Sequence, residues 1–167
     1  MNRILPTVGL IVGFALVMAA VNVPAGWRFP TDKDYSEDWA EFRGQIPVPF
    51  HARGDFDGDG TVDDAWILLR DNGKGWGLFV FLSSVGRPIR IKTEVEDAPA
   101  QWYALIAVAP SGKETVCDQG VSKCDKGERK YPSLKNGGFE FLFLGKGSVL
   151  YYWDPLKKQF QRVAKGE

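Results

Sequence analysis

The sequence is poor in the residues that most catalytic and zinc sites use. Its 167 residues include one histidine, two cysteines and two methionines. With His51 as the single imidazole, a Ser-His-Asp or Cys-His system has only one centre to build on, and no serine stands in a Gly-x-Ser-x-Gly context. The sequence therefore does not favour nucleophilic catalysis, and we expect His51 to be a hydrogen-bonded structural or surface residue.

An excess of charge of either sign is also lacking. Lysine and arginine number 21, as do aspartate and glutamate, and removing the first 25 residues takes away only Arg3 and leaves a net charge of −1. A nucleic-acid-binding domain would normally carry a basic stripe or patch. We therefore expect no nucleic-acid partner, and the overall charge implies no strong attraction to a membrane surface.

The N-terminal 25 residues have the composition of a targeting segment. Arg3 is the only charged residue before Arg28, and the apolar run from residue 4 to residue 23 is about long enough to span a bilayer. Two interpretations remain open. The segment is either a signal peptide, cleaved after the small residues of Val23-Pro24-Ala25 or of Val17-Met18-Ala19, or a retained membrane anchor over residues 4–23.

Both interpretations predict an exported protein, periplasmic or secreted, that touches a membrane only through this segment if it is not cleaved. The remaining residues, 26–167, are then expected to form a single β-rich calcium-binding domain. Cys117 and Cys124 are separated by six residues rich in turn formers. In an exported chain such a pair is most simply a disulfide that closes a loop, and the alternative is two free thiols.

Short apolar or alternating runs separated by turn residues predict a mainly β fold, an antiparallel meander. The run at 76–82 and the sequence GFEFLFLG are apolar on both sides, so a single sheet open to water is not expected, and a sandwich, a closed barrel or a strongly bent sheet with the short helix over part of it would suffice. Alternation in Ile89–Val95 predicts a strand with one wet face. The predicted strands are Ala65–Arg70, Trp76–Leu82, Ile89–Val95, Trp102–Ala109, Glu114–Cys117, Phe139–Leu144, Val149–Trp153 and Phe160–Val163.

One short helix is expected ahead of these strands. Asp34 or Ser36 is a suitable N-cap, and Tyr35, Trp39 and Phe42 recur at helical spacing. We expect this aromatic stripe to pack on the domain. Three turns are expected to close hairpins: DNGKG at 71–75, GKG at 145–147 and DPLKK at 154–158.

The sequence GDFDGDGTVDD contains carboxylates at the spacing of a calcium loop. Asp55, Asp57 and Asp59 occupy the first, third and fifth positions, and Gly60 supplies the sharp turn at the sixth. The backbone carbonyl of Thr61 and the carboxylate of Asp63 complete the predicted ligand set. Ca²⁺ is favoured over Mg²⁺ because carboxylate and backbone oxygens suit a large, flexible coordination shell.

Three residues close to these predicted ligands are not expected to bind the ion. Val62 is expected to dock the loop on the domain, and Asp64 is expected to point away from the ion. Trp66 stands where an EF-hand has its bidentate glutamate, and no helical pattern flanks the loop, so an EF-hand is excluded. The alternative to a metal loop is an Asp/Gly turn without metal.

The stretch from Asp55 to about Leu69 resembles the calcium loop of FG-GAP and VCBS-type repeats, in which D-x-D-G-D-G-x-x-D runs directly into an apolar strand. The resemblance implies Ca²⁺ ligation by Asp55, Asp57, Asp59, the Thr61 carbonyl and Asp63, and no more. Those repeats form propellers, whereas this chain has one copy, so a propeller is not expected. With its "YYWD…F" segment at 151–160, the chain also resembles small exported bacterial proteins that have one such loop.

These observations predict an exported, noncatalytic calcium-binding β-domain, a binding or envelope-support module whose partner is a protein or glycan of the envelope. The alternative is a small calcium-dependent hydrolase or lyase that acts on extracellular or cell-wall polymer. In that case Asp64 and His51 would be the assisting groups. A catalytic residue is not assigned.

Overall fold

The computed structural model describes residues 22–35, 37, 48–94, 103–110, 116–117, 120–121, 130–131, 134–143 and 146–165. Most of the expected targeting segment, residues 1–21, lies outside this part of the chain. In the described residues no helix is long and apolar enough to cross a membrane.

The first sheet has five antiparallel strands built around β3 (Asp63–Arg70). On one side β3 pairs with β4 (Trp76–Phe81), which pairs with β5 (Ile89–Glu94). On the other side the two ends of β3 have different partners, β1 (Trp27–Arg28) and β2 (His51–Gly54). The fully buried side chains of β3 and β4 explain why this sheet needs cover on both faces.

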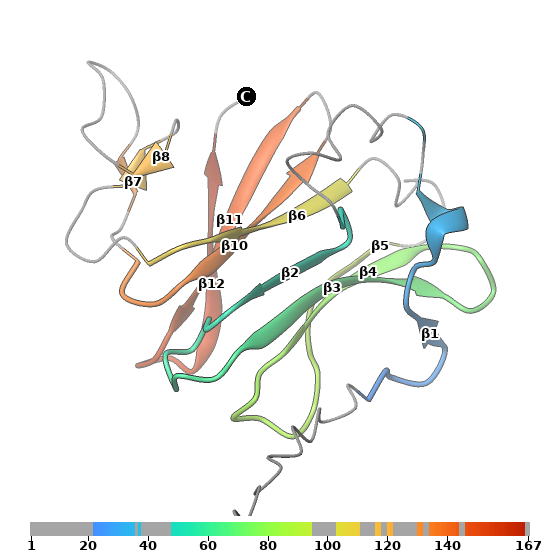
Figure 1. The fold of residues 1–167 in the computed structure, drawn as a ribbon, viewed down its shortest axis with the longest axis horizontal. Coiled ribbons are helices and arrows are strands. Elements are labelled where there is room, and N and C mark those ends of the chain that lie inside the picture. The colour runs from blue at the N-terminus through green and yellow to red at the C-terminus, as the bar shows by residue number, and fades with distance from the viewer. Residues whose placement is uncertain are drawn as a thin grey trace, which may run out of the picture.

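The second sheet has four antiparallel strands in the order β12-β11-β10-β6. Their bounds are Tyr103–Val108 for β6, Gly138–Phe143 for β10, Gly147–Asp154 for β11 and Gln159–Lys165 for β12. A small third sheet lies between β6 and β10 in the chain (Figure 1). It consists of β7 (Val116–Cys117), β8 (Gly120–Val121) and β9 (Lys130–Tyr131).

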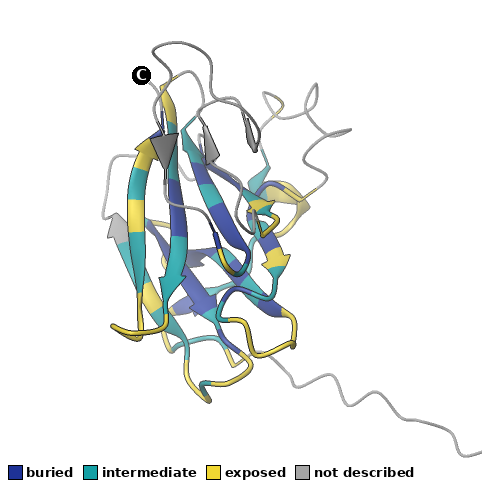
Figure 2. Ribbon diagram, turned by 90° about the vertical axis from the view of Figure 1, so that its left-hand side faces the viewer, coloured by how far each residue is buried: buried dark blue, intermediate teal, exposed yellow. Residues whose placement is uncertain are grey.

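The two large sheets enclose one hydrophobic core, the dark blue interior of Figure 2. Side chains from both sheets meet in it: Trp76 of β4 lies 4.5 Å from Tyr103 of β6 and 5.3 Å from Phe141 of β10, measured between ring centroids. At one edge the sheets approach each other, because the N–H of Leu105 donates to the carbonyl of Pro49 at 2.7 Å. The described strands do not close into a barrel.

The mainly β, antiparallel prediction is confirmed, and so are the expected hairpins at 71–75 and 154–158. In the first, Gly73 adopts a φ of 75°, which is accessible to glycine, and its N–H donates to the Arg70 carbonyl at 2.9 Å. In the second, one oxygen of Asp154 accepts the N–H groups of Leu156 and Lys157 at 3.0 and 3.1 Å. Of GKG, the structure describes only residues 146 and 147, between the paired strands β10 and β11.

The wet face predicted for β5 is present in part, because Arg90 is exposed whereas Lys92 is half-buried over Trp76. A register shift between Leu78 and Phe79 interrupts the alternation. Ile89 and Ile91 both pack on the core, while the ammonium of Lys92 lies over the ring of Trp76, 5.6 Å from its centroid. Alternation in the sequence cannot reveal such a bulge, because it depends on the partner strand.

The described residues contain no α-helix. The 3-10 helix η1 (Asp32–Asp34) follows Thr31, and Tyr35 is extended and stacks on Phe50 with ring centroids 5.0 Å apart. The helix expected after Asp34 or Ser36 would need residues 36–47, of which the structure describes only residue 37. Trp39 and Phe42 lie outside the described residues.

Candidate metal centre

The aspartate loop connects β2 to β3, and its two ends are held together because Gly54 pairs with Asp63 across these strands. Within the loop, Gly58 and Gly60 have φ angles of 83° and 85°. This left-handed conformation strains residues with a side chain, so both turns require glycine. The alternation of aspartate and glycine in the sequence is therefore what allows the chain to fold back on itself here.

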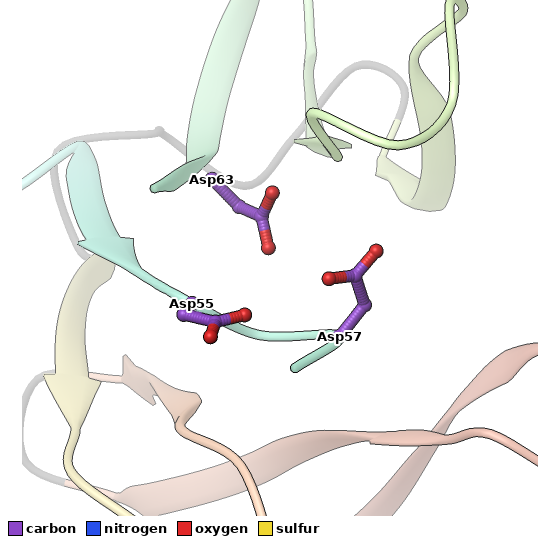
Figure 3. Close-up of side chains that lie close together, drawn as sticks. All are labelled: Asp55, Asp57 and Asp63. Carbon is purple, nitrogen blue, oxygen red and sulfur yellow. The ribbon is translucent and has the colours of Figure 1, made fainter. Parts of the chain in front are cut away.

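Three of the predicted ligands converge. Carboxylate oxygens of Asp55, Asp57 and Asp63 all lie within 4.8 Å of one another, and Figure 3 shows the three side chains pointing into one space. Negative charges at such distances repel one another. A divalent cation would remove this repulsion, and oxygen donors are the ligands that Ca²⁺ takes.

Asp63 is the buried member of this triad, with no exposed surface. One of its oxygens accepts the N–H of Phe56 at 2.8 Å and the other accepts the N–H of Ser83 at 2.8 Å. Burial raises the pKa of the Asp63 carboxyl; the two N–H groups act in the opposite direction, and the nearby charge of Asp57 raises the pKa further. The two hydrogen bonds thus fix the orientation of the Asp63 carboxylate. A cation bound beside it would favour its charged form.

Asp55 and Asp57 are oriented by N–H groups of the loop itself. The two oxygens of Asp55 accept the N–H groups of Gly58 at 2.7 Å and Gly60 at 3.0 Å. One oxygen of Asp57 accepts the N–H of Asp59 at 3.1 Å, and the other accepts the hydroxyl of Ser84. A carboxylate oxygen that accepts one hydrogen bond keeps a second lone pair, so these contacts are compatible with metal ligation.

Asp59 is not part of the triad. The oxygens of Asp59 accept the N–H of Thr61 at 2.6 Å and the hydroxyl of Ser83 at 2.7 Å. The hydrogen bond from Ser83 lowers the pKa of the Asp59 carboxyl, with a further contribution from the N–H of Thr61. Thr61 itself is exposed. The structure thus separates Asp59 from the other three carboxylates that the sequence grouped with it.

The residue that docks the loop is Phe56 and not Val62. Phe56 is fully buried and packs on Phe139 of β10 with ring centroids 5.3 Å apart, whereas Val62 is 53% exposed. The prediction for Val62 was wrong because it used the spacing of an isolated loop. The apolar side chain that points to the second sheet is the one between the first two aspartates.

Two other segments complete the surroundings of the loop, and neither was expected from the sequence. Ser83 and Ser84, which follow β4, donate to the carboxylates of Asp59, Asp57 and Asp63. Ahead of β10, the N–H of Gly137 donates to the carbonyl of Asp55 at 3.2 Å. Asn136 covers Gly58 so closely that a Cβ there would lie 2.5 Å from its amide. Serine and asparagine in turns are too common to have identified these contacts.

Asp64 lies outside the triad and has partners on β2. One of its oxygens is 2.6 Å from Nε2 of His51 and 3.1 Å from Nε of Arg53, and the His51 ring stacks on Trp66 with centroids 3.8 Å apart. Burial acts to raise the pKa of Asp64, but the hydrogen bond and charge of His51, together with Arg53, bring it below its usual value. His51 is therefore a hydrogen-bonded histidine, as expected. Its partner, Asp64, is the other assisting group of the alternative hypothesis of a hydrolase or lyase.

The expected pairing of Cys117 with Cys124 falls partly outside the described residues. Cys117 belongs to β7, and Cys124 is not described.

No protein-family model, curated protein or solved structure matches the chain in comparisons of its sequence and fold. The site must therefore be interpreted from its own geometry.

Proposed function

We propose that the aspartate loop, residues 55–63, binds one Ca²⁺ ion and that the protein is an exported, noncatalytic β-domain stabilised by this ion. The observation that carries the proposal is the convergence of Asp55, Asp57 and Asp63, whose ligand oxygens lie within 4.8 Å of one another. Backbone N–H groups already orient these carboxylates, so binding an ion would order few further groups. The proposed loop is of the FG-GAP and VCBS type in its spacing.

The donor set favours Ca²⁺ over other divalent ions. All candidate ligands are oxygens, which disfavours zinc, and the described residues offer no histidine or cysteine to the triad. Mg²⁺ requires near-ideal octahedral geometry. Ca²⁺ accepts a larger and more flexible coordination shell, which suits a loop whose carboxylates are buried to different extents. Asp59 remains a proposed ligand that would join after a change of side-chain rotamer or through water, and the Thr61 carbonyl remains the proposed backbone ligand.

The ion would stabilise a junction of three chain segments. Asp63 binds the backbone of Ser83 after β4, and the carbonyl of Asp55 binds the backbone of Gly137 before β10. Neutralising the loop would therefore strengthen contacts between the two sheets as well as within the loop. This role is structural, and it fits an export signal or anchor in residues 1–25 and a partner protein or glycan in the envelope.

Calorimetric titration of Ca²⁺ into the chelator-treated full chain tests the proposal, with the melting temperature followed in parallel. We expect one site, and at a hundredfold excess of free Ca²⁺ over the dissociation constant a stabilisation of about 2.7 kcal/mol. The Asp57→Ala variant should bind Ca²⁺ at least about tenfold more weakly and should gain correspondingly less stabilisation. Asp154→Ala is the matched control, because this aspartate also accepts two N–H groups in a turn but lies outside the triad. Absence of binding in the unmodified chain would refute the proposal.

A second candidate function is supported by the short contact between His51 and Asp64. Their separation of 2.6 Å is that of a carboxylate that orients an imidazole, as in a general-base pair, and Arg53 adds a cation beside it. A hydrolase or lyase acting on a cell-wall or extracellular polymer would use His51 as the base. Turnover of such polymers is measured with the unmodified chain and with the His51→Ala and Asp64→Asn variants. Turnover that neither variant affects would exclude this pair as the catalytic groups.

A further inference from the structure

Two of the three large hydrophobic side chains that the described residues expose lie at the end of the molecule that carries the aspartate loop. Val62, within the loop, is 53% exposed, and Leu156, in the turn between β11 and β12, is 94% exposed. The third, Val48, is 38% exposed and lies before β2, at the opposite end of that strand. A leucine with almost no protein contact gains nothing for the fold.

The register of the strands places Leu156 on the same end as the loop. Tyr152 of β11 pairs with Gly138, the first residue of β10, and the N–H of the preceding Gly137 donates to the carbonyl of Asp55. β11 ends two residues later at Asp154, so its turn projects beyond this junction. In Figure 1 the loop and the β11–β12 turn are both at the lower left.

Charged residues lie in the loop, in the β11–β12 turn and in the two segments that contact the loop. Among the described residues, the loop and the three segments around it contribute five carboxylates and four exposed cations, a net charge of −1 without a metal ion. Bound Ca²⁺ would change the net charge to +1, because the ion carries two positive charges. The carboxylates are Asp55, Asp57, Asp59, Asp63 and Asp154, and the cations are Arg87, Lys135, Lys157 and Lys158.

We propose that this end of the domain, once loaded with Ca²⁺, docks on an anionic phospholipid surface, with Val62 and Leu156 entering the interface and the lysines facing headgroups. The inference rests on the proposed Ca²⁺ binding. Apolar insertion and attraction to anionic lipids act together in such peripheral contacts. Without the ion, the exposed carboxylates repel the same surface at short range.

A lipid surface fits these observations better than a protein partner. The two apolar side chains stand on separate turns among charged residues, so they do not form the contiguous patch that a stable protein interface buries. A bilayer accepts isolated side chains inserted at different points. The apolar run at residues 4–23, if retained, would also keep the domain close to a bilayer.

Backbone hydrogen exchange of the full chain, detected by mass spectrometry, tests the docking with vesicles of phosphatidylcholine and of phosphatidylcholine mixed with phosphatidylglycerol. This measurement locates the contact, so vesicle binding through the N-terminal segment does not obscure it. With Ca²⁺ and anionic vesicles, we expect exchange in residues 154–158 to slow roughly fivefold relative to phosphatidylcholine vesicles. With chelator, the two lipids should give equal rates.

Leu156→Asp should abolish the slowing, and Val48→Asp, which adds the same charge at the far end, should preserve it. Equal rates in both lipids with Ca²⁺ present would overturn the docking proposal. Slowing in concentrated protein without vesicles would assign the surface to a second copy of the chain instead. Calorimetry on the same samples separates the two proposals, because Ca²⁺ binding without lipid protection refutes only the docking.

Discussion

Asp63 and Ser83 are joined by a 2.8 Å hydrogen bond between a buried carboxylate and a backbone N–H, although they are 20 residues apart in the chain. The same carboxylate accepts the N–H of Phe56 at 2.8 Å with its other oxygen. A single side chain therefore fixes both the interior of the aspartate loop and the turn after β4. This relationship makes Asp63 a structural residue even before any metal is considered.

Replacing Asp63 by alanine is expected to lower the free energy of unfolding by about 2 to 3 kcal/mol, since two N–H groups lose their acceptor and one of them is buried. Asp63→Asn should cost less, because its amide oxygen still accepts one of the two. Urea denaturation of the metal-free protein measures both values. Asp32→Ala, at an exposed position, is the control and should change stability by less than about 0.5 kcal/mol. Equal stabilities of all four proteins would show that these hydrogen bonds contribute nothing.

Asp57→Ala should weaken Ca²⁺ binding more than Asp59→Ala. The Asp57 carboxylate belongs to the triad, whereas Asp59 is already engaged by Ser83 at 2.7 Å and Thr61 at 2.6 Å and must leave them to bind an ion. Loss of one direct carboxylate ligand is expected to cost at least about tenfold in affinity, or about 1.4 kcal/mol. Parallel calorimetric titrations measure the order, and the reverse order would assign Asp59 to the inner set of ligands.

Asp34→Asn is expected to reduce the dependence of stability on acid pH. Two hydrogen bonds of 2.8 Å from Arg28 are the main cause that lowers the pKa of the Asp34 carboxyl, although partial burial acts to raise it. A carboxyl whose pKa is lower in the folded state stabilises the protein above its unfolded pKa, and this contribution is lost as pH falls below that value. Because Arg28 is 38% exposed, we expect about 1 kcal/mol.

Urea midpoints at about pH 5 and about pH 2.5 measure this effect, and Asp32→Asn is the control outside the ion pair. The unmodified chain should lose more stability between the two pH values than Asp34→Asn. Identical losses would mean that the ion pair does not contribute in solution.

Phe56→Ala should destabilise the protein by about 3 to 5 kcal/mol, because it removes a fully buried ring that packs on Phe139 and leaves a cavity between the loop and the second sheet. Val62→Ala, in the same loop but 53% exposed, should change stability by less than about 0.5 kcal/mol. Thermal unfolding measures the loss of stability in both variants. A larger loss for Val62→Ala would mean that Val62 docks the loop on the domain, as the sequence predicted.

Local sequence patterns were sufficient for much of this protein. Runs of strand length between turn residues predicted strands β3 to β6 and β10 to β12 within a few residues, and Asn-Gly in 71–75 predicted the first hairpin. Strands as short as β1 and β2 were missed, because two to four residues carry no periodicity. The spacing of aspartate and glycine identified the loop, since neighbouring residues alone decide where its chain can turn.

Only the tertiary structure decided which groups meet across the sheets. It paired Asp63 with Ser83, assigned the docking of the loop to Phe56, and brought His51 of β2 against Asp64 of β3. It also introduced the bulge that turns Lys92 toward Trp76. The physical reason is range: turn geometry and alternation depend on residues a few positions apart, whereas hydrogen bonds and packing between strands depend on register, which no single segment contains.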